Sequence, residues 1–267
     1  MEYDVPSVTT AVRILKVLSR YRHKSCSLKE ISELAHVNKT SCLRILRTLE
    51  REDFIKYDSK RKEYSLGPYL IPLGKRALEL NPAVTTATAE LAVIAQRTQL
   101  TTVLVRRVSR DRVMYLATEE PPGNHPKISV SIGQHVPIAG VSFGRCFIAY
   151  DEDSEWNHFV ELGLVSYTPH SIVDPILFIQ TLRQIRHDGY SISRGSLTPG
   201  LSAIAAPVFN QESHVEFVVA CLAMTSELDS TREMDIVHVI LDSTRKLSEF
   251  NGYQGQHDAQ PLEDYSW

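Results

Sequence analysis

Apolar residues recur at helical spacing in three successive segments near the start of the chain. They fall at Ala11, Ile14, Leu15 and Leu18 within residues 8–21, at Leu28, Ile31, Leu34 and Ala35, and at Cys42, Ile45, Leu46 and Leu49. Spacings of three and four place such residues on one face of a helix, so we predict three short helices around a small core. Ser27 and Glu30 have the pattern of a capping box, and Asn38 suits the N-cap of the third helix.

A β-hairpin is predicted directly after these helices. Residues 54–57 and 63–66 read as two short strands, and Asp58-Ser59-Lys60-Arg61-Lys62 lies between them. Two helices joined by a tight turn and followed by a basic hairpin are typical of a winged helix-turn-helix, which presents a helix to the major groove of DNA. The alternative is a small helical bundle with an ordinary solvated charge run. The agreement of caps, polar face and hairpin favours the winged helix-turn-helix.

The face of the third helix opposite its apolar stripe is polar and basic. Hydroxyl groups in the first turn and arginines one and two turns later are what phosphate and base-edge contacts require. We therefore expect this helix to bind double-stranded DNA, with the cations of the hairpin on flanking phosphates. The predicted DNA-binding residues are Asn38, Lys39, Thr40, Ser41, Arg44, Arg47, Thr48, Lys60, Arg61 and Lys62.

The pattern changes after the hairpin. Helices are predicted at 68–80 and from Pro82 to Thr98, and they either carry dimer contacts or act as a passive spacer. Beyond residue 100 we expect strands at 102–105, 112–116, 127–132, 201–209 and 215–224, and helices from about 138, at 174–187 and at 231–250. Strands and helices mixed in this way predict an α+β fold for the larger part of the chain.

The distribution of charge supports the same division. Residues 1–75 contain 15 Lys and Arg against 9 Asp and Glu, a net charge of +6, whereas the remainder has 14 basic and 23 acidic residues, a net charge of −9. The mild overall charge of −3 therefore conceals a basic head on an acidic body. Phosphates attract the head and repel the body, as a DNA-binding regulator requires.

The remaining composition limits other functions. A chain of 267 residues can form two domains, and no segment approaches the ~18 apolar residues of a membrane span. Its four cysteines are scattered, with no Cys-x-x-Cys and no histidine at ligand spacing, so we expect free thiols, no metal site and no cofactor. The first residues lack the basic and apolar regions of a signal peptide, which predicts a cytoplasmic protein.

One motif suggests a function of another class. Gly140-Val141-Ser142-Phe143-Gly144 fits Gly-x-Ser-x-Gly, the nucleophile elbow of α/β-hydrolases. Asp174 and either His187 or His214 follow in the order that a catalytic triad would need. Pro137, however, stands where the buried strand before the elbow should be, and the chain lacks the strand–helix alternation of a hydrolase. We therefore expect no enzymatic activity and keep a serine hydrolase using Ser142 as the alternative.

Several blocks, in order, resemble the IclR family of bacterial transcriptional regulators over about residues 7–250. The family's first helix is similar to SVTTAVRILKVLSRY, its helix-turn-helix to SLKEISELAHVNKTSCLRILRTLE, and its wing exit and linker to YSLGPYLIPLG. In the body, DRVMYLA, IGQHVPIAGVSFGR and IRHDGYSISRGSLTPGLSAIAAPVF follow the family's sensor motifs. Each block is weak alone, whereas this many in sequence are specific.

The resemblance implies a winged helix-turn-helix at 1–67, a linker helix at 68–81 and a GAF-like α+β effector-binding domain at 82–250. Residues 251–267 are polar, which predicts a flexible tail. It also implies homodimers or homotetramers on a palindromic operator. The expected effector is a small organic acid that changes DNA affinity or the recruitment of RNA polymerase. Such a regulator is expected in the bacterial cytoplasm, at the nucleoid when it binds DNA.

The positions that match the family's ligand site depart from members that sense very small acids. Those members have an Asp after the Gly-Tyr pair, a Cys before Ile-Ala-Ala and two Ser on the next strand; the matching residues here are Ser193-Arg194, Ala203, and Ala220 with Leu222. Each polar ligand group left unmet there costs about 1–3 kcal/mol, which predicts a larger, partly aromatic acid. Gly144-Arg145 is similar to the branch that controls aromatic-acid catabolism.

The resemblance thus implies effector contacts from four stretches of the body. The expected effector-binding residues are Ile138, Ala139, Gly140, Val141, Phe143, Gly144, Arg145, Ser193, Arg194, Ala203, Ala220 and Leu222. A ligand carboxylate is expected near Arg145 or Arg194; the alternative is that these arginines are surface or dimer-contact residues.

Overall fold

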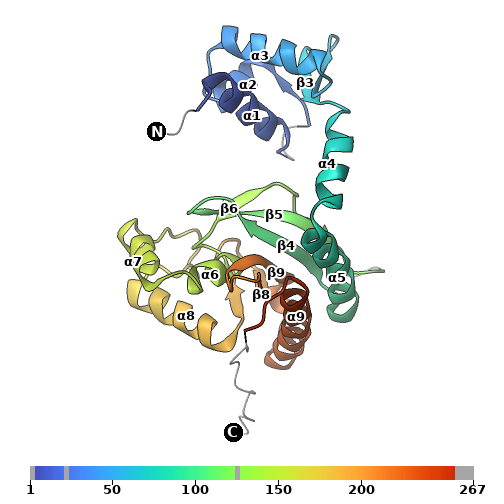
Figure 1. Cartoon of the computed structure of the whole chain (residues 1–267). Coiled ribbons are helices and arrows are strands. Elements are labelled where there is room, and N and C mark those ends of the chain that lie inside the picture. The colour runs from blue at the N-terminus through green and yellow to red at the C-terminus, as the bar shows by residue number, and fades with distance from the viewer. Residues whose placement is uncertain (1–3, 21–23, 124–126, 256–267) are drawn as a thin grey trace. The chain divides into compact units, whose positions relative to one another are not determined.

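The computed structural model describes residues 4–20, 24–123 and 127–255 (Figure 1). The chain forms two compact units, with the boundary between Pro82 and Ala83. Each unit has its own hydrophobic core, and each is described separately. None of the helices in the described ranges is long and apolar enough to cross a membrane.

Three helices and a small antiparallel sheet form most of the N-terminal unit. The helices are α1 (Pro6–Leu18), α2 (Leu28–Leu34) and α3 (Lys39–Arg51), and the sheet has the order β1-β3-β2, from β1 (Cys26–Ser27), β2 (Ile55–Asp58) and β3 (Glu63–Leu66). Their shared core buries Ile14, Ile31, Cys42, Leu46 and Ile55 to 2% exposure or less. Helix α4 (Leu70–Glu79) follows the hairpin and buries none of its residues. The predicted winged helix-turn-helix is confirmed.

The helix caps predicted in this unit are present. The Ser27 hydroxyl accepts a hydrogen bond from the Glu30 N–H, and the Glu30 carboxylate accepts one from the Ser27 N–H at 2.8 Å. Helix α1 begins two residues before its predicted start, because Pro6 suits the first helical turn, and it ends at Leu18. The predicted end at Tyr21 lies outside the described residues.

A six-stranded antiparallel sheet with the order β6-β5-β4-β9-β8-β7 is the centre of the C-terminal unit. Its strands are β4 (Thr101–Arg107), β5 (Arg112–Glu119), β6 (His135–Pro137), β7 (Ser191–Arg194), β8 (Leu201–Phe209) and β9 (Val215–Met224). Helices α5 (Pro82–Thr98) and α9 (Ser230–Phe250) cover one face; α6 (Ser142–Ala149), α7 (Asp153–Glu161) and α8 (Pro175–Asp188) lie on the other (Figure 1). The predicted α+β fold is confirmed.

The central strands show why the sheet has two hydrophobic faces. Along β8, Ala203 and Ala205 pack in the cluster with α6, whereas Ile204 and Ala206 pack in the cluster with α9. Side chains alternate between the faces of a strand, so a strand that is buried on both faces needs an almost continuous apolar run. This requirement accounts for the composition of Leu201–Phe209 and for the small residues that leave room beneath α6.

The strand predicted at 127–132 does not form. These residues have no regular secondary structure; the Ile128 N–H donates to Thr101 Oγ1 at 3.1 Å, and β6 occupies the free edge of β5. Their alternation arises because Ile128 and Val130 pack on the core without strand pairing. Conversely, no strong period predicts β7 or α7. Strand β7 forms because its four residues pair with β8.

Candidate nucleic-acid interface and ligand cavities

The polar face of α3 is set by the burial of its apolar stripe. Cys42 and Leu46 are fully buried in the core, so Arg44 and Arg47 face solvent. The exposed residues of this face also include Lys39, Thr40 and Thr48, while Ser41 is half-buried. The first turn contains no acidic residue, and the positive end of the helix dipole is therefore available to an anion. This face combines the charge and the donors that nucleic-acid contacts need.

Two of the predicted DNA-binding residues already have structural partners in α3. Asn38 is the N-cap, and its Oδ1 accepts the Ser41 N–H at 2.8 Å, which leaves its amide NH₂ for an outside contact. Thr48 Oγ1 donates its proton to the Arg44 carbonyl at 3.1 Å, so its hydroxyl remains an acceptor. The guanidinium groups of Arg44 and Arg47 are thus the stronger donors to a base edge or a phosphate.

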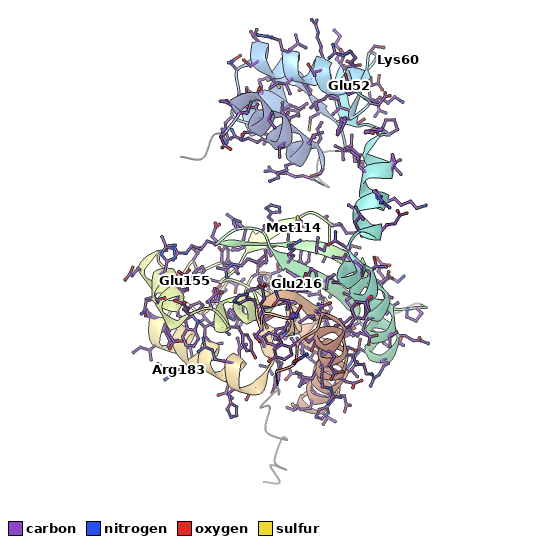
Figure 2. All side chains as sticks on the ribbon, viewed as in Figure 1. Glu52, Lys60, Met114, Glu155, Arg183 and Glu216 are labelled. Atoms are coloured by element: carbon purple, nitrogen blue, oxygen red, sulfur yellow. The ribbon has the colours of Figure 1, made fainter. Side chains whose placement is uncertain are left out.

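The tip of the β2–β3 hairpin is ordered by Asp58. Its carboxylate accepts the backbone N–H groups of Lys60 at 2.9 Å and Arg61 at 3.1 Å, and these bonds, with that of Arg61 the larger cause, lower the pKa of Asp58. Lys62 adopts the left-handed region with φ of 58°. Lys60, Arg61 and Lys62 are exposed and make no ion pair with the described residues; Figure 2 labels Lys60 at this tip. The hairpin tip therefore has a hydrogen-bonded backbone and three exposed basic side chains.

A cavity of about 200 Å³ lies on the α6 side of the sheet in the C-terminal unit; we call it the sheet cavity. Its lining residues are Tyr115, Ile128, Ser129, Val130, Gln134, Val136, Gly140, Val141, Phe143, Ser193, Leu197, Thr198, Leu201, Ser202, Ala203 and Leu222. None of these is Asp, Glu, Lys, Arg or His, and burial raises the pKa of Tyr115 to about 12. The cavity is uncharged, with an apolar wall and a few hydroxyl and amide groups.

The structure brings half of the expected effector-binding residues to this cavity. These are Gly140, Val141, Phe143, Ser193, Ala203 and Leu222. Ile138 and Ala139 line a neighbouring cavity, which also touches Gly140. Gly144 and Ala220 line neither cavity: Gly144 packs against the backbone of Ile138, and Ala220 is fully buried in β9.

Arg194 does not line the cavities. It follows Ser193 on β7, so it points to the opposite face of the sheet, where its guanidinium pairs with the Glu233 carboxylate of α9 and its Nε donates at 2.9 Å. Glu233 is 7% exposed. This ion pair holds the strand at the sheet edge to the last helix. The exposed, ion-paired position of Arg194 fits the alternative of a surface residue, and a ligand carboxylate beside it stays a prediction.

Arg145 is a buried cation without an acidic partner among the described residues. It is 1% exposed, its Nη1 donates to the Ala139 carbonyl at 3.4 Å, and its Nε has no hydrogen-bond partner in this part of the chain. Burial lowers its pKa to about 10, so the guanidinium stays protonated at neutral pH. It is neither a surface residue nor a lining residue of either cavity. Its guanidinium contacts the backbone of the segment from Ile138 to Val141, which lines both cavities.

Ser142 lacks the environment of a catalytic nucleophile. It is fully buried at the first position of α6, and its Oγ has no partner among the described residues. Asp174 instead caps α8, with Oδ1 accepting the Leu177 N–H at 2.8 Å, and His187 contacts the neighbouring Asp188. The Gly-x-Ser-x-Gly match follows from packing: Gly144 allows α6 to approach Ile138 closely, and Ser142 is the small residue at the helix start.

Several cavity residues escape sequence reasoning. Tyr115 could have been predicted from the sequence, because side chains two residues apart on a strand share a face and Val113 is apolar. Gln134, Leu197 and Thr198 stand in turns and loops, which have no period to follow. Only the folding of these loops over the sheet brings them to the cavity.

Comparisons with known proteins agree with this architecture. The family model of the bacterial transcriptional regulator IclR C-terminal domain matches residues 76–249, and that of the IclR helix-turn-helix domain matches residues 7–59. An IclR transcriptional regulator from Alicyclobacillus acidocaldarius has a similar structure, with a TM-score of 0.90, 49% identity and coverage of 94% of this chain and all of that chain. These matches span both units.

Two further proteins are similar over nearly their whole length. The regulator XynR of Escherichia coli is 25% identical over 93% of this chain and 99% of its own. An IclR homologue from Microbacterium hydrocarbonoxydans, solved with 4-hydroxybenzoate, has a TM-score of 0.78 at 16% identity and covers 92% of this chain and 98% of its own. The relatives are transcriptional regulators and not enzymes. This chain belongs to the IclR family of bacterial transcriptional regulators, with a helix-turn-helix that binds DNA and a C-terminal effector-binding domain.

Proposed function

We propose that this regulator binds a palindromic operator as a dimer and releases or remodels it when a small, partly aromatic acid enters the sheet cavity. The exposed basic face of α3, with no acidic residue in its first turn, is the observation that carries the DNA-binding half. Arg44 and Arg47 read base edges, Lys39, Thr40 and Ser41 hold phosphates near the helix start, and the wing cations contact flanking phosphates. The protein acts at the nucleoid in the bacterial cytoplasm, as expected for a DNA-binding member of a bacterial family.

Removing one wing charge should weaken binding to every DNA sequence alike. Arg61→Ala removes one exposed cation from the hairpin tip but leaves the turn, because only the Arg61 backbone bonds to Asp58. We expect the plot of log association constant against log salt concentration to become less steep by about 0.9, the contribution of one phosphate contact. The affinities for operator and for unrelated DNA should fall together. Fluorescence anisotropy across a salt series measures this. Arg183→Ala, an exposed cation on α8 of the other unit, is the control (Figure 2); a loss confined to the operator would contradict the assignment.

The proposed dimer contact is the apolar surface of α4. Ile71 is 73%, Leu78 52% and Leu73 42% exposed on a helix that buries nothing in the described chain. Ile71 and Leu78 are two turns apart on one face of this exposed helix, which favours pairing with a second copy, and a two-fold dimer matches a palindromic site. Ile71→Glu with Leu78→Glu should convert dimers to monomers in sedimentation velocity and lower operator affinity. Arg76→Glu, an exposed position on the opposite side of the same helix, is the matched control. An unchanged sedimentation coefficient in the double variant would place the dimer contact elsewhere.

The proposed effector is a small aromatic acid. The sheet cavity supplies an apolar wall, and the N–H groups at the uncapped start of α6 beside Val141 and Phe143 suit a carboxylate. Its volume, below the ~300–1,000 Å³ of drug-sized pockets, suits a single ring. The structural neighbour solved with 4-hydroxybenzoate supports this class.

A panel of acids tests the effector. We expect benzoate derivatives, including 4-hydroxybenzoate, to raise the melting temperature, because a bound ligand adds RT ln(1 + [L]/Kd) to the free energy of unfolding. Ala203→Leu should abolish this increase by filling the cavity. Differential scanning fluorimetry with the matched neutral amides isolates the contribution of the carboxylate. Stabilisation by glyoxylate or pyruvate alone would contradict the proposal.

A further inference from the structure

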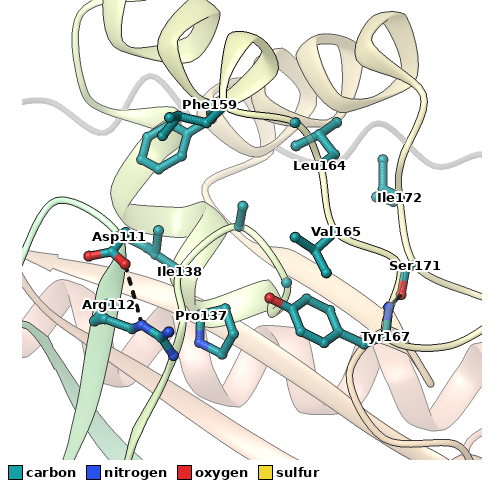
Figure 3. Close-up of a pocket in the computed structure, with 14 residues that line it drawn as sticks. Asp111, Arg112, Pro137, Ile138, Phe159, Leu164, Val165, Tyr167, Ser171 and Ile172 are labelled. Atoms are coloured by element: carbon teal, nitrogen blue, oxygen red, sulfur yellow. Dashed lines mark hydrogen bonds and ion pairs between the residues drawn. The ribbon is translucent and has the colours of Figure 1, made fainter.

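A second cavity of about 260 Å³ lies on the other side of the segment Ile138–Val141 from the sheet cavity. We call it the loop cavity; residues 162–172 and α7 form one wall, and Arg112 with Pro137 and Ile138 forms the other (Figure 3). We propose that it is a second ligand site, distinct from the effector site, and that it binds a small monocarboxylate with an apolar body.

The polar groups gather at one end of the loop cavity. Arg112 is half-exposed at the start of β5, and the hydroxyl of Tyr167 points to the same side, next to Pro137 (Figure 3). Arg112 Nε lies 3.4 Å from Asp111 Oδ2, longer than a good charge-assisted hydrogen bond. Its remaining donors can form a two-pronged contact with a carboxylate, to which the phenol adds a third donor.

A buried cation lies next to the wall of the loop cavity. Asp111 offsets Arg112, but the buried guanidinium of Arg145 reaches Ala139 in the cavity wall and has no acidic partner among the described residues. Ala139 and Gly140 line the loop cavity, and α6 directs its N-terminal end at the same segment. A buried, unpaired cation close to a cavity favours an anionic guest and disfavours a cationic one.

The opposite end of the loop cavity is apolar. Phe159, Leu164 and Ile172 line it, and Val165, which is 59% exposed, also lines the cavity. A ring or branched alkyl group of a ligand would remove these side chains from water. The class of ligand therefore has a carboxylate at one end and a single ring or branched chain at the other.

The two cavities share structural elements. Gly140 lines both, and the Tyr167 ring packs so closely on it that an added Cβ would lie 2.9 Å from the ring. Next to Tyr167, Thr168 Oγ1 donates to the Gly195 carbonyl at 2.7 Å and Ser171 Oγ to the Ser196 carbonyl at 2.8 Å. The following residues, 197 and 198, line the sheet cavity. A ligand in the loop cavity would thus affect the effector site through the Tyr167–Gly140 contact and through the hydrogen bonds to residues 195 and 196.

Methyl-resolved NMR of the full-length protein separates the sites, with phenylacetate as the probe. Ile138, Val165 and Ile172 report on the loop cavity, and Ile128, Val130 and Leu222 report on the sheet cavity. We expect saturable shifts of the first set. Arg112→Gln should raise the Kd derived from them by about tenfold or more while leaving the Kd from the second set unchanged. Val165→Trp, a change at an exposed position, should abolish the loop-cavity shifts.

Arg106→Gln on the adjacent strand β4 is the matched control, because Arg106 is exposed and lines neither cavity. Phenylacetamide and L-phenylalanine test the charge of the ligand, and both should bind the loop cavity more weakly than phenylacetate. Shifts confined to the sheet cavity, an Arg112→Gln variant that binds as the wild type does, or tighter binding of either test compound would each overturn the proposal. The sheet-cavity shifts report separately on the proposed effector site.

Discussion

The double substitution Arg44→Ala and Arg47→Ala is expected to abolish specific operator binding while the protein stays folded. Both side chains are exposed and lie opposite the buried stripe of Cys42 and Leu46, so truncation removes no core packing. A two-pronged arginine contact to a guanine edge contributes about 1–3 kcal/mol of discrimination, and two such contacts amount to a loss of roughly thirtyfold or more. Binding to unrelated DNA should fall much less, because the wing cations remain.

Fluorescence anisotropy with operator and scrambled duplexes at equal salt measures this difference. Arg51→Ala is the control on the same helix: Arg51 lies at the C-terminal end of α3 and pairs with Glu52 at 3.2 Å, so its loss should change operator affinity little. Circular dichroism melts confirm that each variant is folded. Operator binding that survives the double substitution would mean that another element reads the DNA.

Gly144→Ala is expected to destabilise the C-terminal unit by about 3 kcal/mol or more, among the largest effects of a one-carbon change. An added Cβ would stand 2.7 Å from the Ile138 carbonyl carbon and closer still to its oxygen. Backbone cannot rotate aside as a side chain can, so α6 must move away from the segment Ile138–Val141. That segment lines both cavities, so we also expect ligand binding to be lost.

Differential scanning calorimetry measures the loss, and Gly74→Ala is the matched control. Gly74 is also helical, but nothing lies within 4 Å of its added Cβ, and alanine should stabilise α4 by up to about 1 kcal/mol. The two glycine variants should thus shift stability in opposite directions. A Gly144→Ala protein that melts as the wild type does would show that the contact with Ile138 is not tight in solution.

Much of the fold follows from local pattern. The capping box at Ser27, the cap at Asn38 and the strands Leu201–Phe209 and Val215–Met224 were all predicted from residue type and spacing, because caps, helix stripes and buried strands depend on near neighbours. Strand β7 and the irregular 127–132 segment were not, because pairing with β8 and packing against Thr101 override weak local preferences.

The difference between what sequence and tertiary structure determine is clearest at Arg145 and Arg194, the two arginines that the sequence predicts near a ligand. Sequence by itself determined that the chain contains a basic winged helix-turn-helix and an α+β unit, since periodicity and charge order are properties of the chain. It also marked Arg145 and Arg194 as candidates, but it could not separate them. Only the tertiary structure decided that Arg194 lies on the α9 face of the sheet and pairs with Glu233, whereas Arg145 is buried next to the segment that lines both cavities. A one-residue change of register along a strand reverses the face that a side chain occupies, and burial depends on elements distant in sequence.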